Sequence, residues 1–200
     1  MPRPREFRTD DALDRAIAEF RRRGYGGASL DGLTGAMGIG RGSLYGAFGD
    51  KRALFLAALA RYADGTTGHL VSRLDDASDP LGAVRETLRT VARRAADPEG
   101  RFGCLITNTL AELGTDDADV AAIVEGALGA IGRAYERALL RARAAGTLPA
   151  GRSPRALARF LVLTMQGLRV MGRSGASEAD LLAMADTAFG AIGAGRRLAR

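Results

Sequence analysis

The chain has 200 residues, of which 46% are hydrophobic and 26% charged, and it carries a formal net charge of +6 at pH 7. This composition is typical of a folded protein with a sizeable core. No apolar run reaches the roughly 20 residues that a membrane-spanning helix requires, and the charged first residues lack the apolar segment of a secretory signal. We therefore expect a cytoplasmic protein without a membrane partner.

The cysteine and histidine content limits the chemistry of the chain. There is one cysteine, Cys104, and one histidine, His69. A single cysteine cannot form a disulfide within the chain, and one cysteine with one histidine cannot complete the usual structural zinc site. We expect neither a metal site nor a cofactor.

The positive charge is denser in the first quarter of the chain. Residues 1–55 contain ten basic and seven acidic side chains, whereas 56–200 contain nineteen and sixteen. Every basic residue except Lys51 is arginine, whose guanidinium is always charged and binds phosphate in a bidentate manner. This distribution is compatible with a polyanionic partner of the N-terminal part.

The first predicted element is a helix over 10–23. Leu13, Ile17 and Phe20 recur at the spacing of one helix face. Glycines from Gly24 onward are typical of a helix end. This segment has the pattern of an amphipathic helix packed on a core.

Two short helices and several longer ones are predicted next. Ser29 is a natural N-cap for a helix over 30–37, a second short helix over 41–48 follows after three residues, and Asp50 caps a long helix. The later helices are expected at 81–96, 103–113, 118–145, 154–173 and 177–194. No segment alternates with the period of a strand, so the expected fold is all-α, with no sheet.

Residues 29–55 have the pattern of a helix-turn-helix, in which two short helices are joined by a tight turn that contains glycine. Leu44 and Phe48 lie four residues apart and are expected to anchor the second helix of the pair. The apolar side of the first helix and of the turn is formed by Leu30, Leu33, Ala36, Met37 and Ile39. The second helix is expected to direct outward Arg41, Gly42, Ser43, Tyr45 and Gly46.

The same segment resembles the TetR family of bacterial transcriptional regulators. The family motif passes from a small-residue turn to a Leu-Tyr pair, a Phe and a Lys, and this chain has Ser43-Leu44-Tyr45, Phe48, Lys51 and Leu54 in that order. Two later stretches, GCLITN at 103–108 and GLRVMGRSGAS at 167–177, are also similar to the family. The resemblance implies a three-helix DNA-binding domain over 1–55. It further implies a helical ligand-binding and dimerisation domain over 56–200.

The resemblance also implies which residues contact DNA. Tyr45 and Lys51 would contact phosphates, and Arg41 and Ser43, beside Gly42, would reach base edges or phosphate. Ser29 would contact the opposite phosphate wall. Hydroxyls, arginines and helix N-termini are common phosphate partners, and arginine is the commonest reader of guanine. Before this domain, Arg3, Arg5 and Arg8 form either an additional DNA-binding arm or a solvated tail.

Two positions depart from the family motif. Gly40 stands where the family usually has a serine that caps the recognition helix, and Ala47 replaces an aromatic residue or histidine. Glycine is only a few tenths of a kcal/mol worse than serine at an N-cap. These departures bear on the base contacts and not on the fold.

The resemblance implies, from the order of the helices within the family, that the last two helices form a dimer interface. The alternative is that their apolar residues are core within one chain. These residues are Leu157, Phe160, Leu161, Leu163, Thr164, Leu168, Met171, Leu181, Leu182, Ala185, Ala188, Phe189 and Ile192. Helices over 81–145 would enclose a cavity for a small-molecule effector. Its candidate lining residues are Tyr62, His69, Phe102, Thr107, Asn108, Tyr135, Met165 and Gln166, and ordinary packing is the alternative for each.

Cys104 is a further candidate because it lies at the predicted start of a helix, with Arg101 three residues before it. A helix N-terminus and a nearby cation both lower the pKa of a thiol. Cys104 is therefore either a sensor of oxidants or electrophiles, or a small inert residue of the core.

Taken with the resemblance, these features predict a ligand-responsive, DNA-binding transcriptional regulator. We expect a homodimeric repressor that leaves its double-stranded operator DNA when a small molecule binds or when a thiol is modified. The alternatives are an enzyme that uses Cys104 with His69, and an adaptor that uses the helix-turn-helix for protein contacts. We expect no enzymatic activity, because no phosphate-binding loop or nucleophile motif is present.

Overall fold

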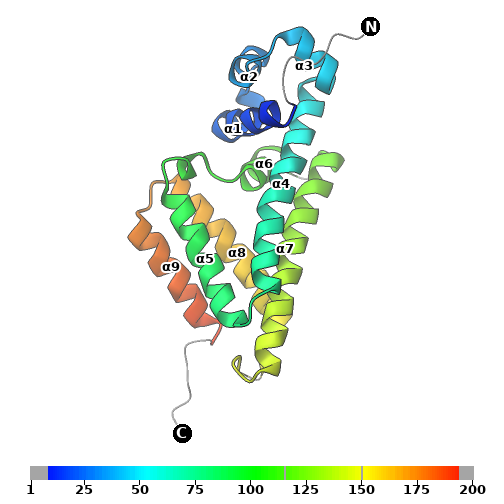
Figure 1. The fold of residues 1–200 in the computed structure, drawn as a ribbon. Helices are drawn as coiled ribbons and strands as arrows, with labels where there is room; N and C mark the ends of the chain where they lie inside the picture. The colour runs from blue at the N-terminus through cyan, green and yellow to red at the C-terminus, as the bar shows by residue number, and fades with distance from the viewer. Residues whose placement is uncertain (1–8, 115, 150, 194–200) are drawn as a thin grey trace. The chain divides into compact units, whose positions relative to one another are not determined.

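The computed structural model describes residues 9–114, 116–149 and 151–193. These residues form nine α-helices and one short 3₁₀ helix, η1, with no strand among them (Figure 1). The all-α prediction is confirmed. The elements are α1 (Thr9–Gly27), α2 (Leu30–Met37), α3 (Arg41–Phe48), α4 (Lys51–Asp75), α5 (Pro80–Ala96), η1 (Gly100–Phe102), α6 (Leu105–Leu113), α7 (Ala118–Ala144), α8 (Pro154–Arg173) and α9 (Glu178–Ala191).

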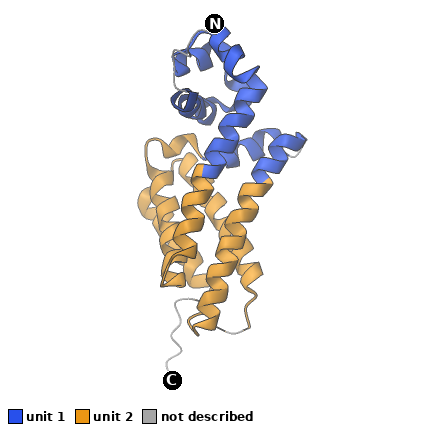
Figure 2. Cartoon of the chain, turned by 45° about the vertical axis from the view of Figure 1, so that its right-hand side comes forward, with its two compact units in different colours: residues 1–64, 104–124 blue, residues 65–103, 125–200 orange. Residues whose placement is uncertain are grey.

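The chain divides into two compact units. Unit 1 comprises the described residues of 1–64 and 104–124, and unit 2 those of 65–103 and 125–200 (Figure 2). The expected domain boundary at residue 55 lies inside α4, and both α4 and α7 continue from one unit into the other. Unit 1 therefore holds the helix-turn-helix together with α6 and the start of α7, because α6 packs against α1.

Local capping explains why α2 and α3 have the predicted bounds. The hydroxyl of Ser29 accepts a hydrogen bond from the amide of Gly32 over 3.0 Å. Gly38 ends α2 in the left-handed conformation, with φ of 70°, which glycine adopts without the cost of a Cβ clash. Gly40 caps α3 without a side-chain hydrogen bond, as expected, and Asp50 accepts from the amide of Ala53 over 2.7 Å.

Several helix ends differ from the predictions, most of them by one residue, and α9 ends at Ala191 where the prediction extended it to 194. Gly24, with φ of 73° and ψ of 177°, interrupts α1 as expected, but a further short helical stretch continues to Gly27. The helix that was predicted over 103–113 begins at Leu105, because η1 precedes it and Cys104 has extended backbone angles at the N-cap. The sequence pattern missed η1, which is too short to show a period.

The core of unit 1 includes buried side chains from each of α1, α2, α3 and α4. The rings of Phe20 on α1 and Phe55 on α4 meet edge to face, with centroids 5.0 Å apart. Leu33 of α2 and Leu44 of α3 are fully buried. Burial of such side chains stabilises a fold by about 1.5–3 kcal/mol each, so these residues hold α3 in place.

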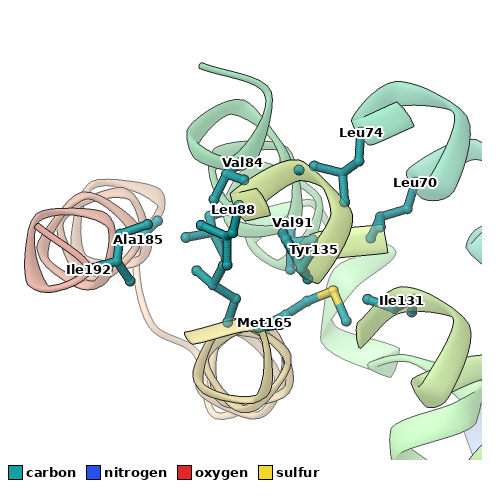
Figure 3. Close-up of a cluster of buried hydrophobic side chains, with 14 of the residues drawn as sticks. Leu70, Leu74, Val84, Leu88, Val91, Ile131, Tyr135, Met165, Ala185 and Ile192 are labelled. Carbon is teal, nitrogen blue, oxygen red and sulfur yellow. The ribbon is translucent and has the colours of Figure 1, made fainter. Parts of the chain in front are cut away.

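The core of unit 2 is formed by α5, α8 and α9 with parts of α4 and α7. Helix α5 packs against both α8 and α9, and Figure 3 shows Tyr135 of α7 within the buried cluster. Ion pairs link α5 to α9 through Arg85 and Asp186, and α4 to α7 through Asp75 and Arg137. None of the described helices is long and apolar enough to cross a membrane.

Candidate nucleic-acid interface

Helix α3 presents an exposed surface around one buried anchor. Leu44 is fully buried and Phe48 is half-buried. Tyr45 keeps 47% of its surface exposed. The other residues that were expected to point outward are also exposed, namely Arg41, Gly42, Ser43 and Gly46. The first half of α3 therefore offers a guanidinium and two hydroxyls to a partner, next to free N–H groups at the helix N-terminus.

Arg41 is held by a residue that the sequence analysis did not single out. Its Nε and Nη2 donate to Oδ1 of Asp31 over 3.0 and 2.6 Å. The hydrogen bond and the charge of Asp31 raise the pKa of Arg41 further, so the guanidinium stays charged. The ion pair joins α2 to α3. No periodic signal marks Asp31, because the pairing depends on how the two helices meet.

Lys51, the first residue of α4, lies over an aromatic ring. Its Nζ is 4.6 Å from the ring centroid of Tyr25, a distance that suits a cation–π interaction. The ring of Tyr25 packs on Phe55, with centroids 4.8 Å apart. The ammonium group of Lys51 is therefore placed by Tyr25, another residue that the sequence analysis missed.

The backbone of Tyr25 is in turn held by α6. The carboxylate of Glu112 accepts hydrogen bonds from the amide of Tyr25 over 2.9 Å and from that of Gly26 over 2.6 Å. A Cβ at Gly24 would lie 2.5 Å from Oε2 of Glu112. Asn108 of α6 also donates to the carbonyl of Arg21 over 3.4 Å. The end of α1 is thus fastened to α6 within unit 1.

Other arginines of unit 1 are engaged with carboxylates of the same unit. Arg52 pairs with Asp117 and Asp119 over 2.9 and 2.8 Å. Arg61 donates to Asp14 over 2.7 Å, and this hydrogen bond lowers the pKa of Asp14. These pairs connect the start of α4 to the start of α7, and the middle of α4 to α1.

The candidate effector-site residues are divided between the two units. In unit 1, Cys104 is buried with 3% of its surface exposed, and Arg21 lies 6.0 Å from the ring centroid of half-buried Tyr62. Asn108 makes the bond to Arg21 described above. The burial of Cys104 argues against the alternative of a thiol enzyme, which needs an accessible nucleophile.

In unit 2, Tyr135 stands out among the candidates. Its side chain is fully buried, and its hydroxyl has no hydrogen-bond partner among the described residues. Burial raises the pKa of Tyr135, so the hydroxyl is neutral. Gln166 accepts a hydrogen bond from Arg169 over 2.7 Å, and Met165 is buried in the same cluster as Tyr135.

The remaining candidates for the effector site are exposed or half-buried. His69 is exposed on α4, and Phe102 and Thr107 are half-buried. The hydroxyl of Thr67, which the sequence analysis passed over, is buried without a partner. The candidate arm, Arg3, Arg5 and Arg8, lies outside the described residues. Within the described ranges, no group of three or more His, Cys, Asp or Glu is placed to hold a metal ion.

Comparison with known proteins identifies the family of the chain. Residues 12–58 match the model of the bacterial regulatory proteins of the tetR family, and residues 80–185 match the tetracyclin repressor-like C-terminal domain. The chain belongs to the TetR family. It is a DNA-binding transcriptional regulator, as the resemblance of residues 43–54 implied.

Two similar proteins are both described as helix-turn-helix transcriptional regulators. The chain is 30% identical over 186 residues to the transcriptional repressor ComR of Escherichia coli, covering 92% of this chain and 89% of ComR. It is 35% identical over 148 residues to the uncharacterized regulator YezE of Bacillus subtilis, covering 74% of this chain and 76% of YezE.

A solved structure extends the similarity to a DNA complex. A cysteine mutant of the TetR family regulator CifR, complexed with 26-base-pair operator DNA, superposes with a TM-score of 0.83 at 37% identity. The match covers 94% of this chain and 99% of the CifR chain. The fold of both units is therefore that of a TetR family regulator.

Proposed function

We propose that this protein is a homodimeric repressor that places α3 in the major groove of double-stranded operator DNA and leaves the operator when an effector binds. The observation that carries the proposal is the surface of α3, where Arg41, Ser43 and Tyr45 are exposed around buried Leu44. The major groove is wide enough to admit one such helix. The DNA complex of CifR supports the same use of the fold here.

Each DNA-binding residue has a role that its chemistry allows. Arg41 and Ser43 reach base edges or phosphate from the N-terminus of α3, where N–H groups and the helix dipole favour anions. Tyr45 and Lys51 contact phosphates. Gly42 leaves open space, since a Cβ there would meet nothing within 4 Å, and Ser29 brings the N-terminus of α2 to the opposite phosphate wall.

The homodimer is supported by apolar side chains that unit 2 leaves uncovered. On α8, Leu163 keeps 69% of its surface exposed and Val170 keeps 55%. Phe160 and Met171 of α8 and Met184 of α9 are exposed as well. Apolar groups gathered on two neighbouring helices are typical of a protein interface, and a dimer matches two half-sites of an operator.

The effector is proposed to be a small molecule that binds in unit 2. Tyr135 and Thr67 each bury a hydroxyl without a partner, which costs about 1–3 kcal/mol unless another molecule satisfies it. The proposed lining residues of unit 2 are His69, Phe102, Tyr135 and Gln166. Tyr62 and Asn108 of unit 1 are kept as further candidates.

Modification of Cys104 is the second proposed route of release. Cys104 is the N-cap of α6, and a helix N-terminus favours the thiolate. Because the side chain is buried, an oxidant or electrophile reaches it only when α6 opens locally. Cys104→Ser separates the two routes, since an oxidant that still releases DNA from this variant acts elsewhere.

Fluorescence anisotropy tests the proposed function. The purified protein is titrated against DNA from upstream of its own gene and against scrambled DNA of equal length, each at two salt concentrations. Tight binding that prefers the upstream DNA and weakens with salt is the expected result, because phosphate contacts release counterions. Equal and salt-independent binding to both DNAs would contradict the use of α3 on DNA.

A further inference from the structure

The ion pair between Asp31 and Arg41 lies on the surface that we propose faces DNA. Arg41 is the first residue of α3 and Asp31 the second of α2. Their side chains are 61% and 75% exposed, and an exposed ion pair adds little to the stability of a fold. Stabilisation of unit 1 therefore does not account for a carboxylate beside the main candidate for base recognition.

A carboxylate in this position weakens binding to DNA of any sequence. Asp31 repels phosphates and offsets part of the positive charge of Arg41. This effect is the same for all sequences, so it cannot by itself select an operator. It raises specificity only if Asp31 also favours the contact of Arg41 with one particular base.

The geometry of the pair leaves the outer edge of the guanidinium available to DNA. Arginine carries five N–H donors in a planar fork. Nε and Nη2 each donate one hydrogen to Oδ1 of Asp31, so the hydrogens of Nη1 and the second hydrogen of Nη2 are left for another acceptor. The Nη1–Nη2 edge can donate to O6 and N7 of guanine, the commonest specific contact in the major groove.

Holding the arginine in advance also lowers the entropy cost of the contact. A free arginine side chain has many rotamers, and binding must select one of them. Two hydrogen bonds to Asp31 restrict the long side chain before DNA arrives. A phosphate contact needs only the charge of Arg41, whereas a bidentate contact with guanine needs the plane of the fork in one orientation.

We infer that Asp31 is a specificity-determining residue, which positions Arg41 to read one guanine in each operator half-site. The inference rests on the proposed function, since it assigns a base to one of the side chains on α3. Asp31 itself contacts no DNA and acts through Arg41. The helix-turn-helix therefore recognises a guanine-containing half-site, and the carboxylate of Asp31 contributes by orienting the guanidinium of Arg41.

The experiment selects sequences from a randomised double-stranded DNA library with the wild-type protein and then measures dissociation constants on the selected site and its single-base substitutions. At one position per half-site, the wild type should prefer guanine over the other bases roughly tenfold. Arg41→Ala should abolish this preference at that position alone. Asp31→Ala should reduce it to about twofold or less while binding to scrambled DNA stays equal or tightens.

The Asp31→Asn variant distinguishes the effect of Asp31 on the orientation of Arg41 from the effect of its negative charge on DNA binding. It keeps an acceptor oxygen of the same shape but removes the negative charge, so it should retain most of the guanine preference. The double variant Asp31→Ala with Arg41→Ala should discriminate no worse than Arg41→Ala, because the carboxylate acts only through the arginine. Circular dichroism on each variant checks that the helices are intact.

The outcomes distinguish the inference from the proposed function. If the wild type selects a sequence but Asp31→Ala keeps the full guanine preference, the inference is wrong and the repressor proposal stands. If Arg41→Ala leaves every base preference unchanged, the inference is likewise wrong and the repressor proposal likewise stands. If the wild type selects no sequence at all, the proposed function fails and the inference fails with it.

Discussion

At the scale of the residue, the carboxylate of Glu112 helps to place a proposed DNA contact on another helix. It reaches from α6 to the amides of Tyr25 and Gly26, and the ring of Tyr25 supports Lys51. A proposed phosphate contact on α4 thus depends on a side chain more than sixty residues further along the chain. Neither Glu112 nor Tyr25 has a motif that marks this role.

Replacing Glu112 by alanine should lower the free energy of unfolding by about 1 kcal/mol, because two amides lose a charged acceptor at a largely exposed site. Urea denaturation measures the change. Glu125→Ala is the control, since Glu125 is an exposed glutamate of α7, and it should leave stability within about 0.5 kcal/mol of the wild type. Equal effects of the two variants would show that the bonds of Glu112 do not stabilise unit 1.

Acid should destabilise the protein through carboxylates that are paired with arginine. Four carboxylates have a lowered pKa, namely Asp14, Asp75, Glu86 and Asp117. The main cause is a hydrogen bond from an arginine side chain for the first three, and a hydrogen bond from the backbone amide of Val120 for Asp117. A lowered folded-state pKa contributes stability that is present above the unfolded-state pKa, about 4, and is lost as the pH falls through the folded value.

We therefore expect the free energy of unfolding contributed by these groups to be constant between about pH 7 and pH 5 and to fall below about pH 4. Urea titrations at a series of pH values measure it. Asp14→Asn should flatten the acid limb of the curve. A limb of unchanged steepness in that variant would mean that its pair with Arg61 contributes nothing.

At the scale of the element, the contact between α5 and α8 depends on a glycine. A Cβ at Gly172 of α8 would lie 2.5 Å from the carbonyl oxygen of Ala95 and 2.7 Å from its Cβ. Both atoms belong to the helix body of α5 and cannot swing away. The two helices approach each other closely because position 172 has no side chain.

Gly172→Ala should lower the free energy of unfolding by about 1–3 kcal/mol, the usual cost of overpacking a core. Gly126→Ala on α7, an exposed helical position of unit 2 outside the proposed dimer interface, is the control. A Cβ there meets nothing within 4 Å, so this change should stabilise the helix by up to about 1 kcal/mol. Thermal unfolding measures the melting temperature of both variants. Shifts of the same sign in the two variants would contradict the explanation by close helix packing.

The elements were predictable from the sequence where local chemistry defines them. Ser29, Gly38, Gly40 and Asp50 mark the ends of α2 and α3 through caps and turns, which involve neighbours in the chain. The exposed residues of α3 followed from the position of Leu44. The pairs of Asp31 with Arg41 and of Glu112 with Tyr25 were not predictable, because they exist only once separate helices have packed.

At the scale of the whole molecule, the account requires a dimer. Leu163→Glu should convert the protein to a monomer, because it places a charge on the most exposed large apolar side chain of α8. Sedimentation equilibrium measures the molecular mass. Leu140→Glu on α7, where the leucine is 40% exposed, is the control and should leave the dimer intact. A wild-type monomer, or a dimeric Leu163→Glu variant, would contradict the proposed interface.

The central claim, that the helix-turn-helix binds DNA with the residues named, is tested most directly by the salt dependence of binding in Lys51→Met. Anisotropy titrations over a range of salt concentrations give the slope of log K against log salt. The slope for Lys51→Met should be smaller in magnitude than that of the wild type by about 1.8, since the dimer loses one phosphate contact in each of its two half-sites and each contact contributes about 0.9. The sequence preference should be unchanged. Arg155→Met, which removes an exposed charge from unit 2, should leave the slope as it is. A slope that Lys51→Met does not alter, or that both variants alter equally, would contradict the account.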